Sequence, residues 1–172
     1  MSKNIEVLPI SSQADADAAS EIFFLTSSMT QFVSDQHREN FKYKYFGIYL
    51  EKFPELVLVT KSQGRVLGYC LGASQTDESL FSFQPHLELF KDLYESFPAH
   101  LHINLHPDAQ GLGMGQELIS TWEKLVYSDV KGLHIMTSPM ARNVSFYRRL
   151  GFVQEFVRNY KGSDILFMGK NF

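Results

Sequence analysis

A strand, a glycine-rich turn and a helix follow one another between residues 99 and 128, and this succession constrains the fold more than any other feature. Apolar and polar residues alternate in "AHLHINLH" (99–106), as they do in a β-strand with one buried face. The helix that follows carries Leu118, Trp122 and Leu125 at helical spacing. A strand that leads directly into a helix is typical of α/β proteins, so we expect an α/β domain with a mixed sheet.

The rest of the chain alternates between further strands and helices, without an internal repeat or a linker. "SQG" (62–64) predicts a hairpin between two of the strands, and Gly151 predicts a left-handed helix C-cap. We expect a single domain over residues 1–172, with a mixed central sheet of about six or seven strands, helices on both faces and a helical insertion around 75–98. The other predicted strands are 5–10, 55–61, 65–74, 131–138, 152–160 and 164–170, and the other predicted helices are 11–29, 37–53 and 141–151. The first of these helices carries its apolar residues Ala18, Ile22 and Leu25 at helical spacing.

Composition and charge argue against several functional classes. The chain carries 16 Lys and Arg against 19 Asp and Glu, for a net charge of −3, and no basic run exceeds two residues. Nucleic-acid binding usually needs a clustered basic surface, so we expect none. No segment approaches the roughly 20 apolar residues of a membrane helix, and "MSKNIEV" does not resemble a signal peptide. We therefore expect a cytoplasmic protein that does not bind membranes.

The turn "QGLGMG" (110–115) has the physical properties of an anion site. The first amides of a helix have no intrahelical acceptor, and the helix dipole favours negative charge there. A Walker loop would need Lys-Ser/Thr where Gln116 and Glu117 stand, and a dinucleotide fingerprint would need glycine in place of Gln116. The pattern Gln/Arg-x-x-Gly-x-Gly/Ala does fit, and after "HPDA" it resembles the coenzyme A pyrophosphate loop of the GNAT superfamily of N-acetyltransferases. A glycine-rich turn without a ligand is the alternative.

The segment "FYRRLGF" (146–152) carries the second half of this resemblance. GNAT proteins often place a helix with Tyr, then Leu-Gly-Phe, after the strand that diverges from the motif strand, and the gap between these strands admits the pantetheine arm. The resemblance implies a GNAT fold, acetyl-coenzyme A as co-substrate and no metal. It implies cofactor contacts at Ile103, Leu105, Gln110, Gly111, Leu112, Gly113, Met114, Gly115, Asn143, Phe146 and Tyr147.

Tyr147 has a catalytic role in this interpretation. An amine that attacks the thioester expels a thiolate, which a phenol can protonate, because a phenol with a pKa of about 10 keeps its proton at neutral pH. No nucleophile with a partnered base is visible, so we expect direct transfer to the amine. Backbone N–H groups at Ile103 or Leu105 would polarise the acetyl carbonyl where the strand bulges. A core tyrosine is the alternative for Tyr147.

Two positions depart from the family pattern. Many members have Asn seven residues before the tyrosine, where this chain has Met140, and Asn143 lies at a nearer spacing. The segment "PAHLHINLH" resembles the bacterial branch related to the acetyltransferase-like domain of O-GlcNAcase, in which Pro-x-His-Leu-His-Ile-Asp is typical. Asn104 stands in place of that Asp. Because an amide cannot act as a general base, a carboxylate role at Asn104 is lost.

Polar side chains occupy alternate positions of strand 99–106, namely His100, His102, Asn104 and His106. Same-face neighbours on a strand are about 6.6 Å apart, so one ion cannot bridge the whole row. His100 and His102 could share an ion only with a third ligand such as His134, and we expect no metal site. His102 is the candidate general base, with a satisfied scaffold histidine as the alternative. We expect His106 to be structural and His100 to lie near the surface.

The early helices and the insertion are rich in aromatic residues and are the expected acceptor site. Tyr45 and Asn104 are the predicted acceptor contacts, because an aromatic wall suits a small or sugar-like primary amine. Core packing is the alternative for these aromatic side chains. Two other functions stay open: an acyl-coenzyme A sensor without catalysis, and a protein lysine or N-terminal acetyltransferase. The sequence is also compatible with a homodimer.

Overall fold

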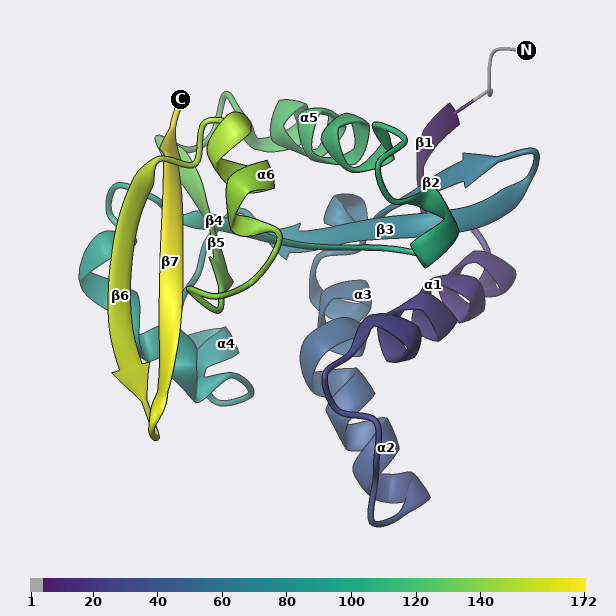
Figure 1. Ribbon diagram of the computed structural model, residues 1–172, viewed down its shortest axis with the longest axis horizontal. Helices are drawn as coiled ribbons and strands as arrows, with labels where there is room; N and C mark the ends of the chain where they lie inside the picture. The colour runs from purple at the N-terminus through teal and green to yellow at the C-terminus, as the bar shows by residue number, and fades with distance from the viewer. Residues whose placement is uncertain (1–4) are drawn as a thin grey trace. The chain divides into compact units, whose positions relative to one another are not determined.

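The computed structural model describes residues 5–172. Seven strands form a mixed sheet in the order β1-β2-β3-β4-β5-β7-β6, with helices beside it, which confirms the predicted α/β class (Figure 1). No helix in this part of the chain is long and apolar enough to cross a membrane. The strands are β1 (Ile5–Pro9), β2 (Leu58–Ser62), β3 (Arg65–Ala73), β4 (Ala99–Leu105), β5 (Gly132–Thr137), β6 (Gln154–Tyr160) and β7 (Ser163–Asn171).

The helical segments include α-helices, one π-helical turn and three 3-10 segments. The α-helices are α1 (Gln13–Thr26), α2 (Asp35–Lys42), α3 (Ile48–Lys52), α4 (Glu78–Phe81), α5 (Met114–Val126) and α6 (Val144–Arg149). The π-helical turn is η1 (Tyr43–Gly47), and the 3-10 segments are η2 (Pro54–Leu56), η3 (Pro85–Leu93) and η4 (Pro107–Ala109). The predicted helical insertion therefore consists of α4 and η3.

The chain divides into two compact units. The first contains Met1–Gly72 and His102–Leu125, and the second contains Ala73–Leu101 and Val126–Phe172. Strand β4 contributes residues to both units. The single domain expected from the sequence stays a prediction.

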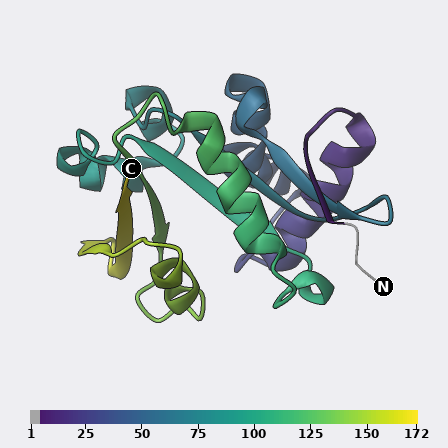
Figure 2. The same ribbon diagram turned by 90° about the horizontal axis from the view of Figure 1, so that it is seen from above.

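In the first unit, β1, β2 and β3 pair antiparallel. The predicted hairpin turn is present, with Gln63 and Gly64 at φ values of 52° and 76°, which suits the twist of the two strands. Strand β2 begins at Leu58, three residues later than predicted, because Pro54–Leu56 form a 3-10 turn. Helix α5 covers one face of these strands, and α1 and α3 cover the other (Figures 1 and 2).

Residues 35–52 form a continuous helical run that matches the helix predicted at 37–53. Pro54 follows its end, as expected for a residue that cannot continue a helix. The π-helical turn Tyr43–Gly47 lies in the middle of this run and contains Tyr45, a predicted acceptor contact. Such turns are frequent at functional sites.

The buried faces of α1 and α5 differ in part from the expected ones. Ile22 and Trp122 are buried, as helical spacing predicts, but Leu25 is 57% exposed and Leu125 is 45% exposed. Phe23 is buried in α1 in place of Leu25, and Val126 is buried in α5 in place of Leu125. The expected inward position of Leu25 and Leu125 is therefore wrong, because burial depends on what lies opposite each helix and not on periodicity alone.

The indole of Trp122 fixes α5 to the segment that precedes β2. Its Nε1–H donates to the Leu56 carbonyl oxygen at 2.9 Å, and the side chain is fully buried. We expect Trp122→Phe to lower the free energy of unfolding by about 1–3 kcal/mol, because the Leu56 carbonyl loses its buried donor. Urea denaturation measures this change.

Leu125→Ala in the same helix is the matched control. Its side chain is partly exposed, so we expect a loss within about 0.5 kcal/mol. Equal losses for the two variants would contradict the assigned role of Trp122.

In the second unit, Phe90 of η3 and the following Tyr94 and Phe97 pack on one face of the antiparallel strands β5, β7 and β6. Phe90 and Phe167 have ring centroids 5.2 Å apart, and both are fully buried. Gly169 lies under Phe97, whose ring would come within 2.9 Å of any Cβ at that position. Gly151 follows α6 with φ of 93°, which confirms the predicted left-handed C-cap.

Candidate functional site

The predicted site residues fall into two groups, one in each unit. The first unit holds the glycine turn, the polar side chains of β4 from His102 onward, and Tyr45. The second unit holds the residues around α6: Asn143, Phe146 and Tyr147.

The segment between β4 and α5 is fixed by backbone hydrogen bonds before it reaches the glycines. The His106 backbone N–H donates to the Leu67 carbonyl oxygen of β3 at 2.8 Å. The His106 imidazole Nδ1 accepts from the Asp108 backbone N–H at 3.2 Å and so caps the 3-10 turn Pro107–Ala109. His106 is therefore structural, as expected from the sequence, and it sets where the glycine turn begins.

The turn itself requires glycine at two positions. Gly111 and Gly113 have φ of 74° and 83°, a backbone conformation that other residues rarely adopt. No atom lies within 4 Å of a Cβ built at either position, so the space beside both is open. Gln110 and Leu112 are exposed, whereas Met114 and Gly115 are buried at the start of α5. The turn thus presents its backbone to solvent.

The beginning of α5 supplies the donors. The Glu117 backbone N–H donates to the Gly113 carbonyl oxygen at 3.1 Å, which begins the helical pattern. The first amides of a helix have no acceptor within it, and α5 is 13 residues long. An open glycine backbone at the positive end of such a helix can bind a phosphate group through N–H donors without a side-chain cation.

Two tyrosines hold the polar side chains of β4. The Tyr49 hydroxyl lies 3.2 Å from His102 Nε2, and the two rings meet edge to face with centroids 5.6 Å apart. The Asn104 amide nitrogen donates to the Tyr69 hydroxyl at 2.7 Å. Burial raises the pKa of Tyr69 above its ordinary value, and the bond from Asn104 only partly offsets this. The Tyr69 hydroxyl therefore remains neutral and acts as a dipole beside Asn104.

Neither tyrosine was recognisable from the sequence as a partner of the predicted site residues. Tyr49 is separated from His102 by 53 residues, and Tyr69 is separated from Asn104 by 35. Tyr49 belongs to the predicted aromatic wall, but its buried position was not distinguishable from that of its neighbours. Strand β3 is apolar along most of its length and is buried on both faces from Gly68 to Ala73, so its pattern did not indicate what Tyr69 contacts.

The aromatic residues of the early helices are partly core and partly accessible. Phe46 is buried and lies edge to face against Tyr69, with ring centroids 5.2 Å apart. Tyr45 is half-buried, with its ring 5.1 Å from that of Phe41. Tyr45 is therefore partly accessible to solvent, whereas Phe46 and Tyr49 are core side chains.

The α6 group is built around Tyr147. Its side chain is buried, and its ring lies edge to face between those of Phe146 and Phe152, at 5.3 and 5.7 Å. The Asn143 side-chain oxygen accepts from the Thr137 hydroxyl at 3.2 Å, which links the start of α6 to the end of β5. Met140 is 92% exposed in the preceding loop. The parallel pairing of β4 with β5 comprises Ala99 with Leu133 and His100 with His134.

His100 and His134 are core side chains of the second unit. His100 is only 2% exposed and its Nδ1 lies 2.6 Å from the Thr76 hydroxyl, so the expectation that it lies near the surface is wrong. The reason is that the insertion covers the start of β4. His134 stacks between Tyr94 and Phe167, at 5.1 and 4.4 Å, with Nδ1 2.7 Å from the Phe97 carbonyl oxygen.

Metal ligation has little support in the described residues. No group of three or more His, Cys, Asp or Glu side chains between residues 5 and 172 could hold an ion. Cys70 is a fully buried free thiol, and burial raises its pKa well above the ordinary value. Cys70 therefore packs as a small apolar side chain of the core.

Known structures with the same fold include acetyltransferases. A crystal structure of a protein called SsHAT has a TM-score of 0.76 at 22% identity, covering 97% of this chain and 98% of the other. A putative acetyltransferase, yncA from Salmonella typhimurium, solved with its cofactor acetyl-CoA, has a TM-score of 0.63 at 18% identity, with 97% and 93% covered. The ribosomal-protein-alanine N-acetyltransferase from Brucella melitensis has a TM-score of 0.64 at 20% identity, with 97% and 99% covered.

A search of curated proteins gives no match. The family model described as "Acetyltransferase (GNAT) domain" matches residues 54–154, which is more than half of the chain and includes both the glycine turn and α6. The chain therefore belongs to the GNAT family of acetyltransferases.

Proposed function

We propose that this protein transfers the acetyl group of acetyl-coenzyme A directly to a primary amine of a small molecule. The observation that supports this most is the turn 110–115, where two positive-φ glycines leave the backbone open at the start of α5. A pyrophosphate carries the negative charge that such a turn favours. The proposed contacts are those implied by the family pattern, from Gln110 to Gly115, with Ile103 and Leu105 of β4 beside the pantetheine arm.

The chain's own residues would perform three tasks in the reaction. Bound acetyl-coenzyme A supplies an activated thioester. His102, directly or through a water molecule, takes a proton from the ammonium form of the acceptor, so that the free amine attacks the acetyl carbonyl. Backbone N–H groups of Ile103 or Leu105 stabilise the oxyanion. Tyr147 donates its proton to the departing sulfur, so that the C–S bond breaks as the C–N bond forms, with Asn143 and Phe146 beside it on α6.

A small acceptor is favoured by the half-buried Tyr45 and by Asn104. The ring of Tyr45 can cover an apolar part of the acceptor. The Asn104 side chain donates its N–H to Tyr69, which leaves its carbonyl oxygen as an acceptor for an amine. The loss of the carboxylate at Asn104 makes a water-mediated or His102-mediated proton transfer necessary.

The second candidate function is acetylation of protein N-termini. It is favoured by the similarity to the Brucella melitensis enzyme, whose name gives ribosomal-protein alanine as its acceptor. We further propose, from "PAHLHINLH", that the chain lies in the bacterial branch related to the acetyltransferase-like domain of O-GlcNAcase. The cytoplasmic location and a homodimer stay predictions.

Free-thiol release from acetyl-coenzyme A distinguishes these functions. We expect thiol release with small primary amines or amino sugars, and none above background with peptides that begin with alanine. Release with the peptides alone would favour the second function. If acetyl-coenzyme A raises the melting temperature but no acceptor promotes thiol release, the protein is a sensor and the enzymatic proposal is wrong.

Tyr49 provides a test of His102 as the base. Tyr49→Phe keeps the ring against His102 but removes the hydroxyl 3.2 Å from Nε2. Loss of one hydrogen bond should lower kcat by about 2- to 10-fold, with little change in the KM for acetyl-coenzyme A. In a His102→Gln background the same change should have no further effect on kcat.

Tyr127→Phe is the control for this pair, because Tyr127 is exposed and contacts the terminal Phe172 ring. Its kcat should match that of the unmodified protein. Fully additive effects of Tyr49→Phe and His102→Gln would show that the tyrosine does not act through the histidine.

A further inference from the structure

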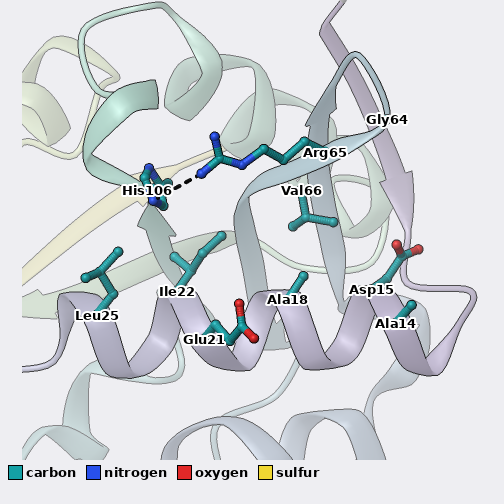
Figure 3. A pocket seen from close by; sticks show the side chains of 10 residues that line it. All are labelled: Ala14, Asp15, Ala18, Glu21, Ile22, Leu25, Gly64, Arg65, Val66 and His106. Carbon is teal, nitrogen blue, oxygen red and sulfur yellow. Dashed lines mark hydrogen bonds between the residues drawn. The ribbon is translucent and has the colours of Figure 1, made fainter.

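A groove in the first unit lies between α1 and the end of the β2–β3 hairpin, with His106 above it (Figure 3). Its volume is about 550 Å³, within the range of small-molecule sites. Helix α1 forms one wall, and Arg65 with His106 forms the opposite wall (Figure 3). The proposed cofactor contacts, from Gln110 to Gly115, are not among the residues that line it.

Two hydrogen-bond donors meet at the wall formed by Arg65 and His106. His106 Nδ1 accepts from the Asp108 backbone N–H at 3.2 Å, so a neutral imidazole carries its proton on Nε2. Nε2 lies 3.4 Å from Nη2 of Arg65, which can only donate. With the proton on Nε2, the contact drawn as a dashed line in Figure 3 brings two N–H donors together, and a carboxylate oxygen beside them would accept from both.

Asp108 does not fill this role within the protein. Its carboxylate lies 3.9 Å from Arg65 Nη1, beyond hydrogen-bond distance, and 3.4 Å from His106 Nδ1, on the other side of the ring from Nε2. It balances part of the positive charge of Arg65. The guanidinium side that faces Nε2 remains directed at the groove.

The wall formed by α1 carries two carboxylates with different surroundings. Asp15 is paired with Lys61, whose Nζ lies 2.7 Å from one of its oxygens. Glu21 lies six residues further along α1, is exposed and lines the groove (Figure 3). The side-chain carboxylate of Glu21 has no ion pair or hydrogen bond with the described residues, so its negative charge is available to a bound cation.

Apolar side chains lie between the two charged walls. Ile22 and Val66 are buried at the base of the groove, and Leu25 lines its end and is largely exposed. A ligand that fits these surfaces needs a carboxylate at one end, an ammonium group near it and an aliphatic body. We propose that this groove is a binding site for a free aliphatic α-amino acid, with its carboxylate on Arg65 and His106 and its ammonium group on Glu21.

Calorimetric titration of the full chain with L-leucine tests this inference. We expect leucine to bind, and both 3-methylbutylamine, which lacks the carboxylate, and 4-methylpentanoate, which lacks the amine, to bind at least about tenfold more weakly. No leucine binding, or equal binding of the three compounds, would overturn the assignment.

Charge-neutral variants test which residue binds the carboxylate of the ligand and which binds its ammonium group. Arg65→Gln should weaken leucine and 4-methylpentanoate binding about tenfold, and Glu21→Gln should weaken leucine and 3-methylbutylamine binding by a similar factor. Arg142→Gln and Glu55→Gln are the matched controls, since both side chains are exposed outside the groove. Unchanged leucine affinity in Arg65→Gln or in Glu21→Gln would contradict the proposed orientation.

Leucine binding in the groove does not depend on acetyltransferase activity. It can be tested separately from acetyl-coenzyme A binding at the glycine turn. Gly113→Asp, designed to remove acetyl-coenzyme A binding, leaves every groove side chain in place and should keep the leucine affinity of the unmodified protein. Leucine binding that disappears in Gly113→Asp would mean that the ligand occupies the cofactor turn and would overturn the groove assignment.

Discussion

Replacing Gly113 with aspartate should abolish acetyl-coenzyme A binding while the fold is kept. The new carboxylate would stand beside the turn at the start of α5, where the proposed pyrophosphate binds. Like charges brought together in a site cost several kcal/mol, so we expect the Kd to rise by at least about 100-fold. Because no atom lies within 4 Å of a Cβ at Gly113, the loss would come from charge at the site and not from a clash in the core.

The chain offers a closely matched control for this variant. Gly162, in the β6–β7 turn, has φ of 87° against 83° at Gly113, and a Cβ there also has no atom within 4 Å. Gly162→Asp should therefore have the same cost in backbone strain, roughly 1–2 kcal/mol, without any effect on the cofactor. Calorimetry measures the binding, and thermal unfolding confirms equal stability. If Gly113→Asp binds acetyl-coenzyme A normally, the pyrophosphate does not bind at this turn.

Tyr147→Phe should lower kcat by about 100-fold and leave cofactor affinity nearly unchanged. A positioned acid contributes about 10²- to 10⁴-fold to a proton-transfer step, and phenylalanine cannot donate a proton. The ring would keep its edge-to-face contacts with Phe146 and Phe152, so the packing of α6 should be preserved. Steady-state thiol release gives kcat, and titration with coenzyme A gives the affinity.

Acyl donors whose leaving thiols differ in acidity provide a second test of Tyr147. If the residue protonates the departing sulfur, an acyl donor with a more acidic thiol should recover part of the lost rate in Tyr147→Phe, because its thiolate leaves without help. Tyr127→Phe, which changes an exposed ring, should behave as the unmodified protein with both donors. An unaltered kcat in Tyr147→Phe would remove this residue from the mechanism.

Local sequence signals predicted the elements that surround the proposed cofactor turn. The alternation of residues 99–105, the glycines at 111 and 113 and the apolar period of α5 each depend on neighbours within a few positions. The hairpin turn at Gln63 and Gly64 and the C-cap at Gly151 were predictable for the same reason. Backbone conformation at such points is decided by one or two residue types.

Features decided by distant packing were not predictable in the same way. Leu125 continues the apolar period of α5 yet lies nearly half in solvent, because residues 5–172 do not cover it fully. His100 is buried because the insertion, through Thr76, covers the start of β4. Alternation identified the side of the strand on which His100 lies, but it could not say which segment would cover that side.

In the candidate site, too, features set by local sequence were predictable and contacts between distant segments were not. Its glycine turn carries a recognisable pattern, whereas the partners of its polar side chains come from β3 and α3, 35 and 53 residues away in sequence. Arg65 did not stand out in the sequence, since a single arginine at the end of a hairpin is common on a protein surface. Only its distance of 3.4 Å from His106 Nε2 connects it with a possible anion site.

A crystal structure with acetyl-coenzyme A is the most direct test of the central claim. We predict that the pyrophosphate oxygens will lie within hydrogen-bond distance of backbone N–H groups between Gly111 and Gly115, with the thioester sulfur near Tyr147. A bound nucleotide located elsewhere, with the glycine turn empty, would contradict the account.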